Sequence, residues 1–353
     1  MTGRATIHDV ARLAGVSLTT VSNVLNGTKT ARIAETTRSK VEQAAAELRY
    51  TPSRVARGLR LQRTQILGMV SDYLATIPHA SEMLLGAQEA ALKRGYHILL
   101  LNTGGQREAE QAAITTLDQL QVDGIIYAAM YHRIVDPPSS LSPDRAVLLD
   151  AWAPGGRLRA VVPDEVGGAH TATEELIRLG HRRIGFLTSV DDIPATHGRL
   201  AGYRQALRAA DIRFNHALVL AQDSVGTDGG HQGAMTLLTR RDRPTALFCF
   251  NDRMAMGAYR AIAELNLRIP DDVSVIGFDN QELIATGLSP ALTTVALPHY
   301  AMGVWAVTTL LDRLHTEHPP APPTKPVKLT CLLVQRQSTG SPPPVDTDTH
   351  QEA

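Results

Sequence analysis

Residues 5–26 read ATIHDVARLAGVSLTTVSNVLN, a pattern of two short helices joined by a tight turn. Thr6 precedes the first helical run of apolar residues and Asp9 follows three residues later, which is the spacing of a capping box. Gly15 permits the turn, and Ser17 is a favourable cap for the second helix. The stretch therefore predicts a helix-turn-helix, whose second helix typically enters the major groove of DNA.

The first 65 residues are the basic part of the chain. They contain eleven lysines and arginines against four acidic residues, a formal charge of +7, and the remaining residues carry −7. A third helix is expected over residues 36–48 and, after Thr51-Pro52, a short basic helix over residues 53–61. A basic head on an acidic body suits a protein whose head alone contacts a polyanion. The +7 charge of the first 65 residues would fit a solvated charged face equally well. The interpretation as a DNA-binding head therefore depends on the helix pattern.

From Ile66 onward, apolar strand-like runs alternate with amphipathic helical stretches. This alternation is typical of parallel sheets with helices on both faces. About 270 residues are many for one open sheet, so an α/β core of two doubly wound parallel-sheet subdomains is expected. The expected division is a head over 1–50, a hinge helix and linker over 51–65, a core over 66–337 (one subdomain about 66–163 plus 296–320, the other about 164–295 plus 324–337) and a disordered tail over 338–353.

Composition and motifs argue against several other classes. No apolar run approaches the ~20 residues of a membrane span, and no apolar segment of a secretory signal follows the N-terminus. Cys249 and Cys331 lie in apolar runs, so buried, reduced thiols and a cytoplasmic location are expected. The motifs G-x-x-x-x-G-K-[ST], G-x-S-x-G, H-E-x-x-H and C-x-x-C are absent. We therefore expect no catalytic residues, metal site or cofactor, although an enzyme or a transport binding protein on a similar core is the competing class.

The helix-turn-helix string closely resembles the LacI/GalR family of bacterial repressors. The resemblance continues through YTPSRVARGL (50–59), LGHRRIG (179–185), GRLAGY (198–203), RPTA (243–246), ND (251–252), MAMG (254–257), PDDVSVIGFD (270–279) and LTT (292–294). It implies a sequence-specific transcriptional regulator, most often a repressor, with a core like that of periplasmic binding proteins. A small-molecule effector would control its affinity for double-stranded operator DNA, and a homodimer would match a pseudo-palindromic operator.

The resemblance also places the second helix against the major groove. Leu18 and Thr19 occupy positions that meet base edges, and Asn23 lies one turn further along. Leu18 can offer only apolar contact, whereas Thr19 and Asn23 can hydrogen-bond to bases or phosphates. Phosphate contacts, which position the head, are expected from Ser17, Thr20 and Ser22.

The segment over residues 53–61 resembles the family's hinge helix. Leu59 matches the leucine that is wedged between base steps of the minor groove, where it bends the duplex. Arg54, Arg57 and Arg60 would neutralise phosphates or enter the narrowed groove. An ordinary surface linker helix is the alternative.

The resemblance places the effector in the cleft between the two core subdomains, where polar groups at strand ends can converge. Arg199, Asn251 and Asp279 are the three positions that match the family's motifs and supply donors and acceptors. A capping role is the alternative for Asp279, and Asn251 can cap the helix that follows it while also binding ligand.

Four further candidates lie at or near strand ends, namely Tyr73, Tyr127, Asp150 and Trp152. Aromatic faces stack on sugar rings, although ordinary packing explains each aromatic residue as well. A sugar or sugar derivative is the family's commonest effector, and a nucleobase or other metabolite acting as corepressor is the alternative. The proline-rich stretch over residues 131–145 departs from the family, which generally has a helix there, so the edge of the cleft is expected to differ.

Overall fold

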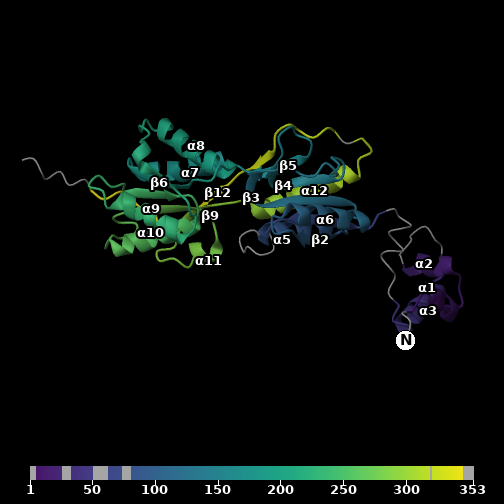
Figure 1. Cartoon of the computed structure of the whole chain (residues 1–353). Coiled ribbons are helices and arrows are strands. Elements are labelled where there is room, and N and C mark those ends of the chain that lie inside the picture. Colours follow the sequence, from purple (N-terminus) through teal and green to yellow (C-terminus); the bar gives the residue numbers. More distant parts are fainter. Residues whose placement is uncertain (1–4, 26–32, 51–62, 74–80, 319, 345–353) are drawn as a thin grey trace, which may run out of the picture. The chain divides into compact units, whose positions relative to one another are not determined.

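The computed structural model describes residues 5–25, 33–50, 63–73, 81–318 and 320–344. The chain forms two compact units, Met1–Gln65 and Ile66–Ala353. Figure 1 shows the first as a helical head and the second as a body built around β-sheets. Within the described ranges, no helix is long and apolar enough to cross a membrane.

The head contains three helices, α1 (Ile7–Ala14), α2 (Leu18–Leu25) and α3 (Glu35–Glu47). Asp9 Oδ2 accepts hydrogen bonds from the amide of Thr6 at 2.9 Å and from its hydroxyl at 2.7 Å, which fixes the start of α1. Gly15 has a φ of +66° and begins the turn. Ser17 Oγ then accepts a hydrogen bond from the amide of Thr20 at 3.1 Å, so α2 begins with a capped end. The predicted helix-turn-helix is confirmed.

A small apolar core holds the three helices together. Val10, Val21 and Val41, one from each helix, have no solvent-exposed surface and belong to one cluster. Helices of 8, 8 and 13 residues are too short to be stable alone in water. Their mutual packing therefore holds the surface of α2 in place.

The body contains two six-stranded sheets, ordered β11-β5-β4-β3-β1-β2 and β12-β10-β9-β8-β6-β7. The first consists of β1 (Ile66–Ser71), β2 (His97–Asn102), β3 (Gly124–Ile134), β4 (Ala146–Trp152), β5 (Arg159–Pro163) and β11 (Val327–Leu329). The second consists of β6 (Ile184–Ser189), β7 (Val219–Gln222), β8 (Ala246–Cys249), β9 (Ser274–Asp279), β10 (Thr293–Ala296) and β12 (Leu332–Val334). Apart from the antiparallel β10–β12 pair, these strands pair in parallel. The predicted α/β fold is confirmed.

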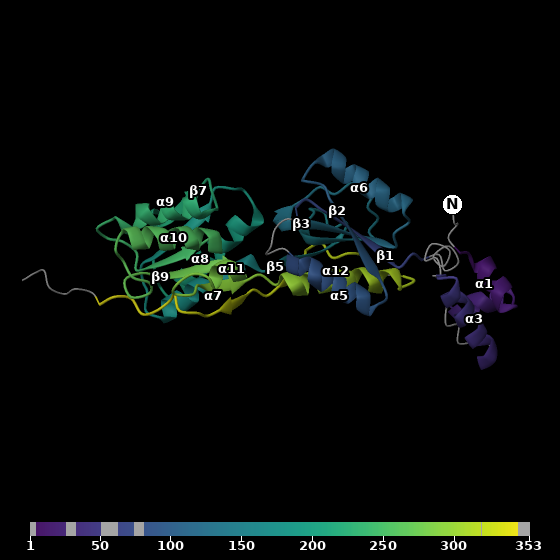
Figure 2. The ribbon, with the colours of Figure 1, turned by 90° about the horizontal axis from the view of Figure 1, so that it is seen from below.

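Helices cover both faces of each sheet (Figure 2). On the first sheet, one face packs against α5 (Ser81–Lys93) and α12 (His299–Leu314), and the other against α6 (Arg107–Gln119). On the second sheet, α7 (Glu165–Arg178) and α8 (Pro194–Ala209) cover one face, and α9 (Thr227–Leu238) and α10 (Asp252–Glu264) the other. A 3₁₀ turn (His216–Leu218) precedes β7, and the short α11 (Glu282–Ala285) follows β9.

Glycines allow paired helices to approach backbone to backbone. A Cβ on Gly202 of α8 would lie 2.2 Å from the carbonyl oxygen of Val166 on α7. Since real Cβ atoms do not approach so closely, any side chain at position 202 would push the two helices apart. This contact fixes α8 against α7, and both helices carry charged residues of the site described below.

The chain passes between the sheets three times, namely between β5 and α7, between β10 and α12, and between β11 and β12. We expected the last passage between residues 320 and 324, and this boundary is wrong. Val327–Leu329 pair with β5 of the first sheet, so the chain crosses only at residues 330–331. Cys331 at this crossing and Cys249 in β8 are both buried and free, as expected.

The packed core also continues beyond residue 337, where we expected a disordered tail to begin. Ser338 is fully buried, and its hydroxyl donates to the carbonyl of Val275 at 2.6 Å and accepts from the amide of Thr293 at 2.8 Å. The imidazole Nε2 of His181 lies 2.9 Å from the carbonyl oxygen of Gly340. Polar anchoring of this kind is invisible in a proline-rich sequence pattern, which explains the error. Residues 345–353 of the expected tail lie outside the described residues.

The segment between β3 and β4 contains no helix. β3 continues to Ile134 with a register irregularity between Ala128 and Arg133, and residues 135–145 form irregular backbone with turns at 139–140 and 143–145. Pro137, Pro138 and Pro143 fall in this segment, and proline lacks the amide donor that a helix interior needs. The last residues of β3 therefore extend further than in a regular strand–helix–strand unit.

Candidate effector cleft and DNA-binding surface

The last residues of β3 contact the elements of the second sheet. His132 Nδ1, near the end of β3, lies 3.8 Å from Glu165 Oε1 at the start of α7. β3 also packs against α8, which follows the carboxyl end of β6. These contacts bring the carboxyl ends of strands from both sheets to one junction, and open α/β sheets bind ligands at such ends.

Arg199 is the central charged group of this junction. Its side chain projects from α8 and is only 4% exposed. Nε donates to Glu165 Oε2 at 2.8 Å, Nη1 donates to the carbonyl of Phe250, and Nη2 lies 3.5 Å from Asp279 Oδ1. The guanidinium carbon lies 3.8 Å from the ring centroid of Phe278 and 4.4 Å from that of Phe250. The structure brings the predicted Arg199 and Asp279 together and adds Glu165.

The Glu165–Arg199 pair is charged at neutral pH. Burial is the largest single influence on Glu165 and raises its pKa, but the charge and hydrogen bonding of Arg199 and the contact with His132 together outweigh burial, and the pKa falls to about 2. Burial lowers the pKa of Arg199. The negative charges of Glu165 and Asp279 and the hydrogen bond to Glu165 together raise it by more, so the pKa lies above its ordinary value. Sequence reasoning missed Glu165 because an acidic residue in the first turn of a helix is already explained by the helix dipole.

Asp150 approaches the same charges from the first sheet. It lies near the end of β4, is 2% exposed and has a φ of +54°. Its Oδ1 is buried and has no hydrogen-bond partner among the described residues. Burial, followed by the negative charge of Glu165, raises the pKa of Asp150 well above its ordinary value. A buried carboxylate oxygen without a donor is costly, so a ligand that donates a hydrogen bond here would relieve that cost.

Four more buried polar atoms near the junction have no hydrogen-bond partner within the described ranges. They are His132 Nδ1, Trp152 Nε1, Thr188 Oγ1 and Thr196 Oγ1. They come from the ends of β3, β4 and β6 and from the first turn of α8. Buried polar groups in native proteins are nearly always satisfied, so bound water or a ligand is expected to complete the hydrogen bonding of these atoms. Of the four, only Trp152 was predicted, because threonines at strand ends have no distinctive sequence signal.

The other predicted effector residues have different surroundings. Asn251 is 3% exposed, its Oδ1 accepts from the amide of Met254 at 2.8 Å, and its Nδ2 donates to the carbonyl of Val225 at 3.0 Å. The structure therefore supports the capping role of Asn251. Tyr73 is 45% exposed, and its hydroxyl donates to the carbonyl of Gly104 at 2.6 Å. Tyr127 is buried and lines a pocket on the α6 side of the first sheet.

The predicted DNA-contacting residues of α2 are partly exposed. Ser17, Leu18 and Thr19 are exposed at the start of the helix, with Leu18 at 40%. Thr20 and Asn23 are half-buried, whereas Ser22 is 5% exposed and is not presented to a phosphate. The hinge residues Arg54, Arg57, Leu59 and Arg60 lie outside the described residues. In the described part of the chain, no group of three His, Cys, Asp or Glu residues is arranged to hold a metal ion.

Comparison with known proteins matches both parts of the chain. Residues 6–53 match the family of bacterial regulatory proteins of the lacI type, and residues 173–339 match a periplasmic binding protein-like domain. The ribose operon repressor of Haemophilus influenzae is 36% identical over 313 residues, and the transcriptional repressor PurR of Vibrio vulnificus is 38% identical over 320 residues. Each alignment covers 88% of this chain and 92% of the relative. A crystal structure of the lac repressor dimer bound to operator and the anti-inducer ONPF superimposes with a TM-score of 0.77 at 27% identity, covering 96% of this chain and 100% of that one.

The chain belongs to the lacI family of bacterial regulatory proteins. It is a DNA-binding transcriptional regulator with an effector-binding core, and its relatives are transcriptional repressors. The predicted family and general function are confirmed.

Proposed function

We propose that the protein is a homodimeric repressor whose operator affinity is controlled by a sugar or sugar derivative bound at the junction of the two sheets. The observation that carries this proposal is the set of unpartnered buried polar atoms on both sides of the junction, with Asp150 on one side and Thr188 and Thr196 on the other. A polyhydroxylated ligand both donates and accepts hydrogen bonds, which this mixture of carboxylate and hydroxyl groups requires.

We favour a sugar over a nucleobase because hydroxyl groups, which both donate and accept hydrogen bonds, match the mixture of Asp150, Thr188 and Thr196 at the junction. The repressor of a ribose operon is among the similar proteins, which agrees with a carbohydrate effector. A nucleobase or another metabolite acting as corepressor is the second candidate.

Control of DNA binding follows from where the ligand would sit. An effector that contacts Asp150 on the first sheet and Thr188 on the second stabilises one relative arrangement of the two subdomains. The equilibrium between the two arrangements shifts toward the one that binds the effector more tightly. The size of the shift is set by the ratio of the effector's affinities for the two arrangements. The site binds its ligand without transforming it, and the protein acts at the bacterial chromosome as a dimer, as the operator-bound lac repressor does.

Thr188→Val tests the assignment with little change of shape. Because the Thr188 hydroxyl has no partner among the described residues, the valine variant should fold with unchanged or slightly raised stability. Its affinity for the effector should fall roughly tenfold, the loss of about one hydrogen bond to a ligand. Isothermal titration calorimetry with a panel of sugars and nucleobases identifies the ligand and measures the loss.

Thr173→Val is the matched control. Thr173 is fully buried in α7, and its hydroxyl donates to the carbonyl of Ala169 at 2.8 Å, so it has no need of a ligand. Its substitution should leave effector affinity unchanged. Equal affinities of both variants and the unmodified protein would contradict the position of the effector, and binding of nucleobases alone would contradict its chemistry.

A further inference from the structure

Asp279, which faces Arg199 at the junction, begins a segment of strained backbone. It is the last residue of β9 and has a φ of +102°, and the next residue, Asn280, has a φ of +53°. Residues other than glycine rarely adopt a positive φ, and two in succession persist only where the surrounding structure holds them. The position of the Asp279 carboxylate therefore depends on the groups that fix residues 279–281.

Asp252, the first residue of α10, fixes this segment at Gln281. Its side chain is fully buried, and its Oδ2 accepts a hydrogen bond from the backbone amide of Gln281 at 2.6 Å. Its Oδ1 accepts from the hydroxyl of Thr294 on β10 at 2.5 Å. A Cβ at Gly277 on β9 would collide with the same Oδ1, so the strand leaves room for this carboxyl group. One side chain thus ties the backbone of Gln281 to α10 and β10.

Arg336, which follows β12, fixes the segment at Asn280. Its Nη2 donates to Asn280 Oδ1 at 2.8 Å, and its Nη1 donates to the carbonyl of Leu292, just before β10, at 2.8 Å. The side chain is largely buried, and the backbone amide of Arg336 donates to Thr293 Oγ1 at 3.0 Å. The planar fork of a guanidinium can serve two acceptors at once in a fixed geometry. Arg336 therefore holds Asn280 at a set place beside β10.

Gln281 connects this support with the effector site. Its side-chain Nε2 donates to Asp279 Oδ2 at 3.1 Å, and Asp279 Oδ1 lies 3.5 Å from Arg199 Nη2. The same residue thus has its backbone held by Asp252 and its side chain on the carboxylate of Asp279. A shift of the segment would move that carboxylate relative to the guanidinium of Arg199.

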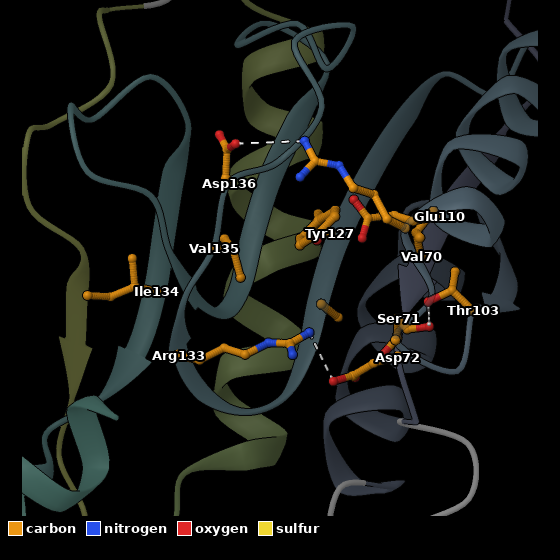
Figure 3. A pocket seen from close by; sticks show the side chains of 13 residues that line it. Val70, Ser71, Asp72, Thr103, Glu110, Tyr127, Arg133, Ile134, Val135 and Asp136 are labelled. Atoms are coloured by element: carbon orange, nitrogen blue, oxygen red, sulfur yellow. Dashed lines mark hydrogen bonds and ion pairs between the residues drawn. The ribbon is translucent and has the colours of Figure 1, made fainter. Parts of the chain in front are cut away.

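The first sheet contains a comparable arrangement after β1. Asp72 is buried and accepts a hydrogen bond from the amide of Met130, in β3, at 3.0 Å. Arg133 Nη2 lies 3.0 Å from Asp72 Oδ2, as Figure 3 shows. Hydrogen bonds to carboxylates are among the stronger ones in proteins, so such groups hold backbone effectively. Both sheets therefore combine a buried carboxyl group with an arginine where strands end.

We propose that Asp252 and Arg336 are positioning residues of the effector site. They hold the carboxylate of Asp279 in the orientation that faces Arg199, and they act on the effector only through it. The proposal rests on the proposed function, since the site that they support is the one assigned to the effector at the junction.

Hydrogen exchange in the effector-free full chain tests the support itself. Arg336→Met keeps the length of the side chain and removes its donors. The amides of residues 279–285 should exchange about tenfold faster than in the unmodified protein, because the segment opens more often. Arg240→Met is the matched control. Arg240, just after α9, also donates to two carbonyl oxygens, and its substitution should leave exchange in residues 279–285 unchanged.

Isothermal titration calorimetry measures the consequence for the ligand. The probes are ribose, glucose, galactose, fructose, adenine, guanine and hypoxanthine. Arg336→Met should lower the affinity for the probe that binds by roughly tenfold, and Arg240→Met should not. Asp279→Asn should also weaken binding, and adding Arg336→Met to it should change little, because both substitutions act on one carboxylate. A residue that only stabilises the fold would weaken binding equally in both backgrounds.

Asp252 provides an independent variant with a conservative rescue. Burial, followed by the charge of Asp279, raises the pKa of Asp252 to about 8, so the carboxyl group is largely protonated at pH 7. Asparagine can likewise accept from the amide of Gln281 and donate to the hydroxyl of Thr294. Asp252→Asn should therefore keep effector affinity and exchange rates, whereas Asp252→Ala should show the tenfold changes. If alanine at this buried position prevents folding, Arg336→Met decides.

The outcomes separate the positioning role from the proposed function. If a sugar binds and Arg336→Met leaves its affinity unaltered, the positioning role is wrong and the carbohydrate assignment stands. Equal weakening with and without Asp279→Asn would also overturn the positioning role. If only a nucleobase binds and shows the expected non-additive loss, the carbohydrate assignment is wrong and the positioning role stands. If no probe binds, the carbohydrate assignment fails, and exchange in residues 279–285 alone decides on the positioning role.

Discussion

Replacing Asp150 by asparagine separates the stability of the junction from its ligand-binding function. The substitution keeps the shape of the side chain and removes a charge whose Oδ1 is buried without a partner among the described residues. Leaving such a group unsatisfied costs about 1–3 kcal/mol, and more when it is charged. Asparagine keeps an acceptor at the Oδ1 position and removes only the charge, so Asp150→Asn should stabilise the effector-free protein by about 1–3 kcal/mol at pH values at which Asp150 is ionised, which raises the melting temperature by roughly 2–4 °C per kcal/mol.

The pH dependence of that gain has a definite sign. Because the pKa of Asp150 is raised in the folded protein, the folded state binds the proton more tightly than the unfolded state. Stability is therefore lost as the pH rises from the ordinary carboxyl pKa through the raised one. The asparagine variant avoids this loss, so its advantage should be small near pH 4 and largest above the raised pKa.

Thermal unfolding followed by circular dichroism between pH 4 and 8, together with calorimetric titration of the effector, measures both effects. Effector affinity should fall by about ten- to a hundredfold, because a charge-assisted hydrogen bond is lost. Asp118→Asn, exposed on α6, is the matched control for removal of one carboxylate. A variant that melts below the unmodified protein at pH 8 would show that the carboxylate is satisfied without ligand, and would refute the reasoning.

Three further predictions concern the head and the C-terminal segment. Leu59→Ala should weaken operator binding roughly tenfold, or about 1.4 kcal/mol, with effector affinity unchanged; unaltered operator binding in fluorescence anisotropy would refute the minor-groove assignment. Ser17→Ala removes the acceptor for the Thr20 amide and should destabilise the head by about 1 kcal/mol, seen as faster amide exchange in α2 but not in α10. His181→Phe removes the imidazole contacts of Thr245, Ser274 and Gly340, although Ser274 and Gly340 keep their mutual hydrogen bonds, and should cost about 1–2 kcal/mol in urea unfolding; unchanged protease resistance near residue 340 would show that the imidazole does not anchor this segment.

The fold was largely predictable because its signals are local. The structure contains the capping hydrogen bonds that the spacing of Thr6 and Asp9 predicts. It also contains the predicted alternation of strands with helices. α12 was not among the predicted helices, although its buried residues recur at helical spacing along HYAMGVWAVTTLLDRL. The boundary at β11 and the burial of Ser338 depend on pairing with distant strands, which the local pattern does not encode.

The site was predictable only where a residue type stands out at a strand end. Arg199 and Asp279 were found in this way, and the structure brings them together. Asn251 has the same sequence signal, but the helix that follows it uses its side chain as a cap. Glu165 and Thr188 were missed because their candidate roles depend on the residues that surround them in the folded chain. A single sequence does not show which residues are neighbours in space.

The central claim is that effector binding at the junction and operator binding by the head are coupled, and reciprocity tests it most directly. Operator affinity is measured by fluorescence anisotropy with and without saturating effector, and effector affinity by calorimetry with and without operator. The account predicts that both affinities change by the same factor, typically about 5- to 150-fold, because linkage is reciprocal. An effector that binds with unaltered affinity whether or not operator is present, and leaves operator affinity unaltered, would contradict it.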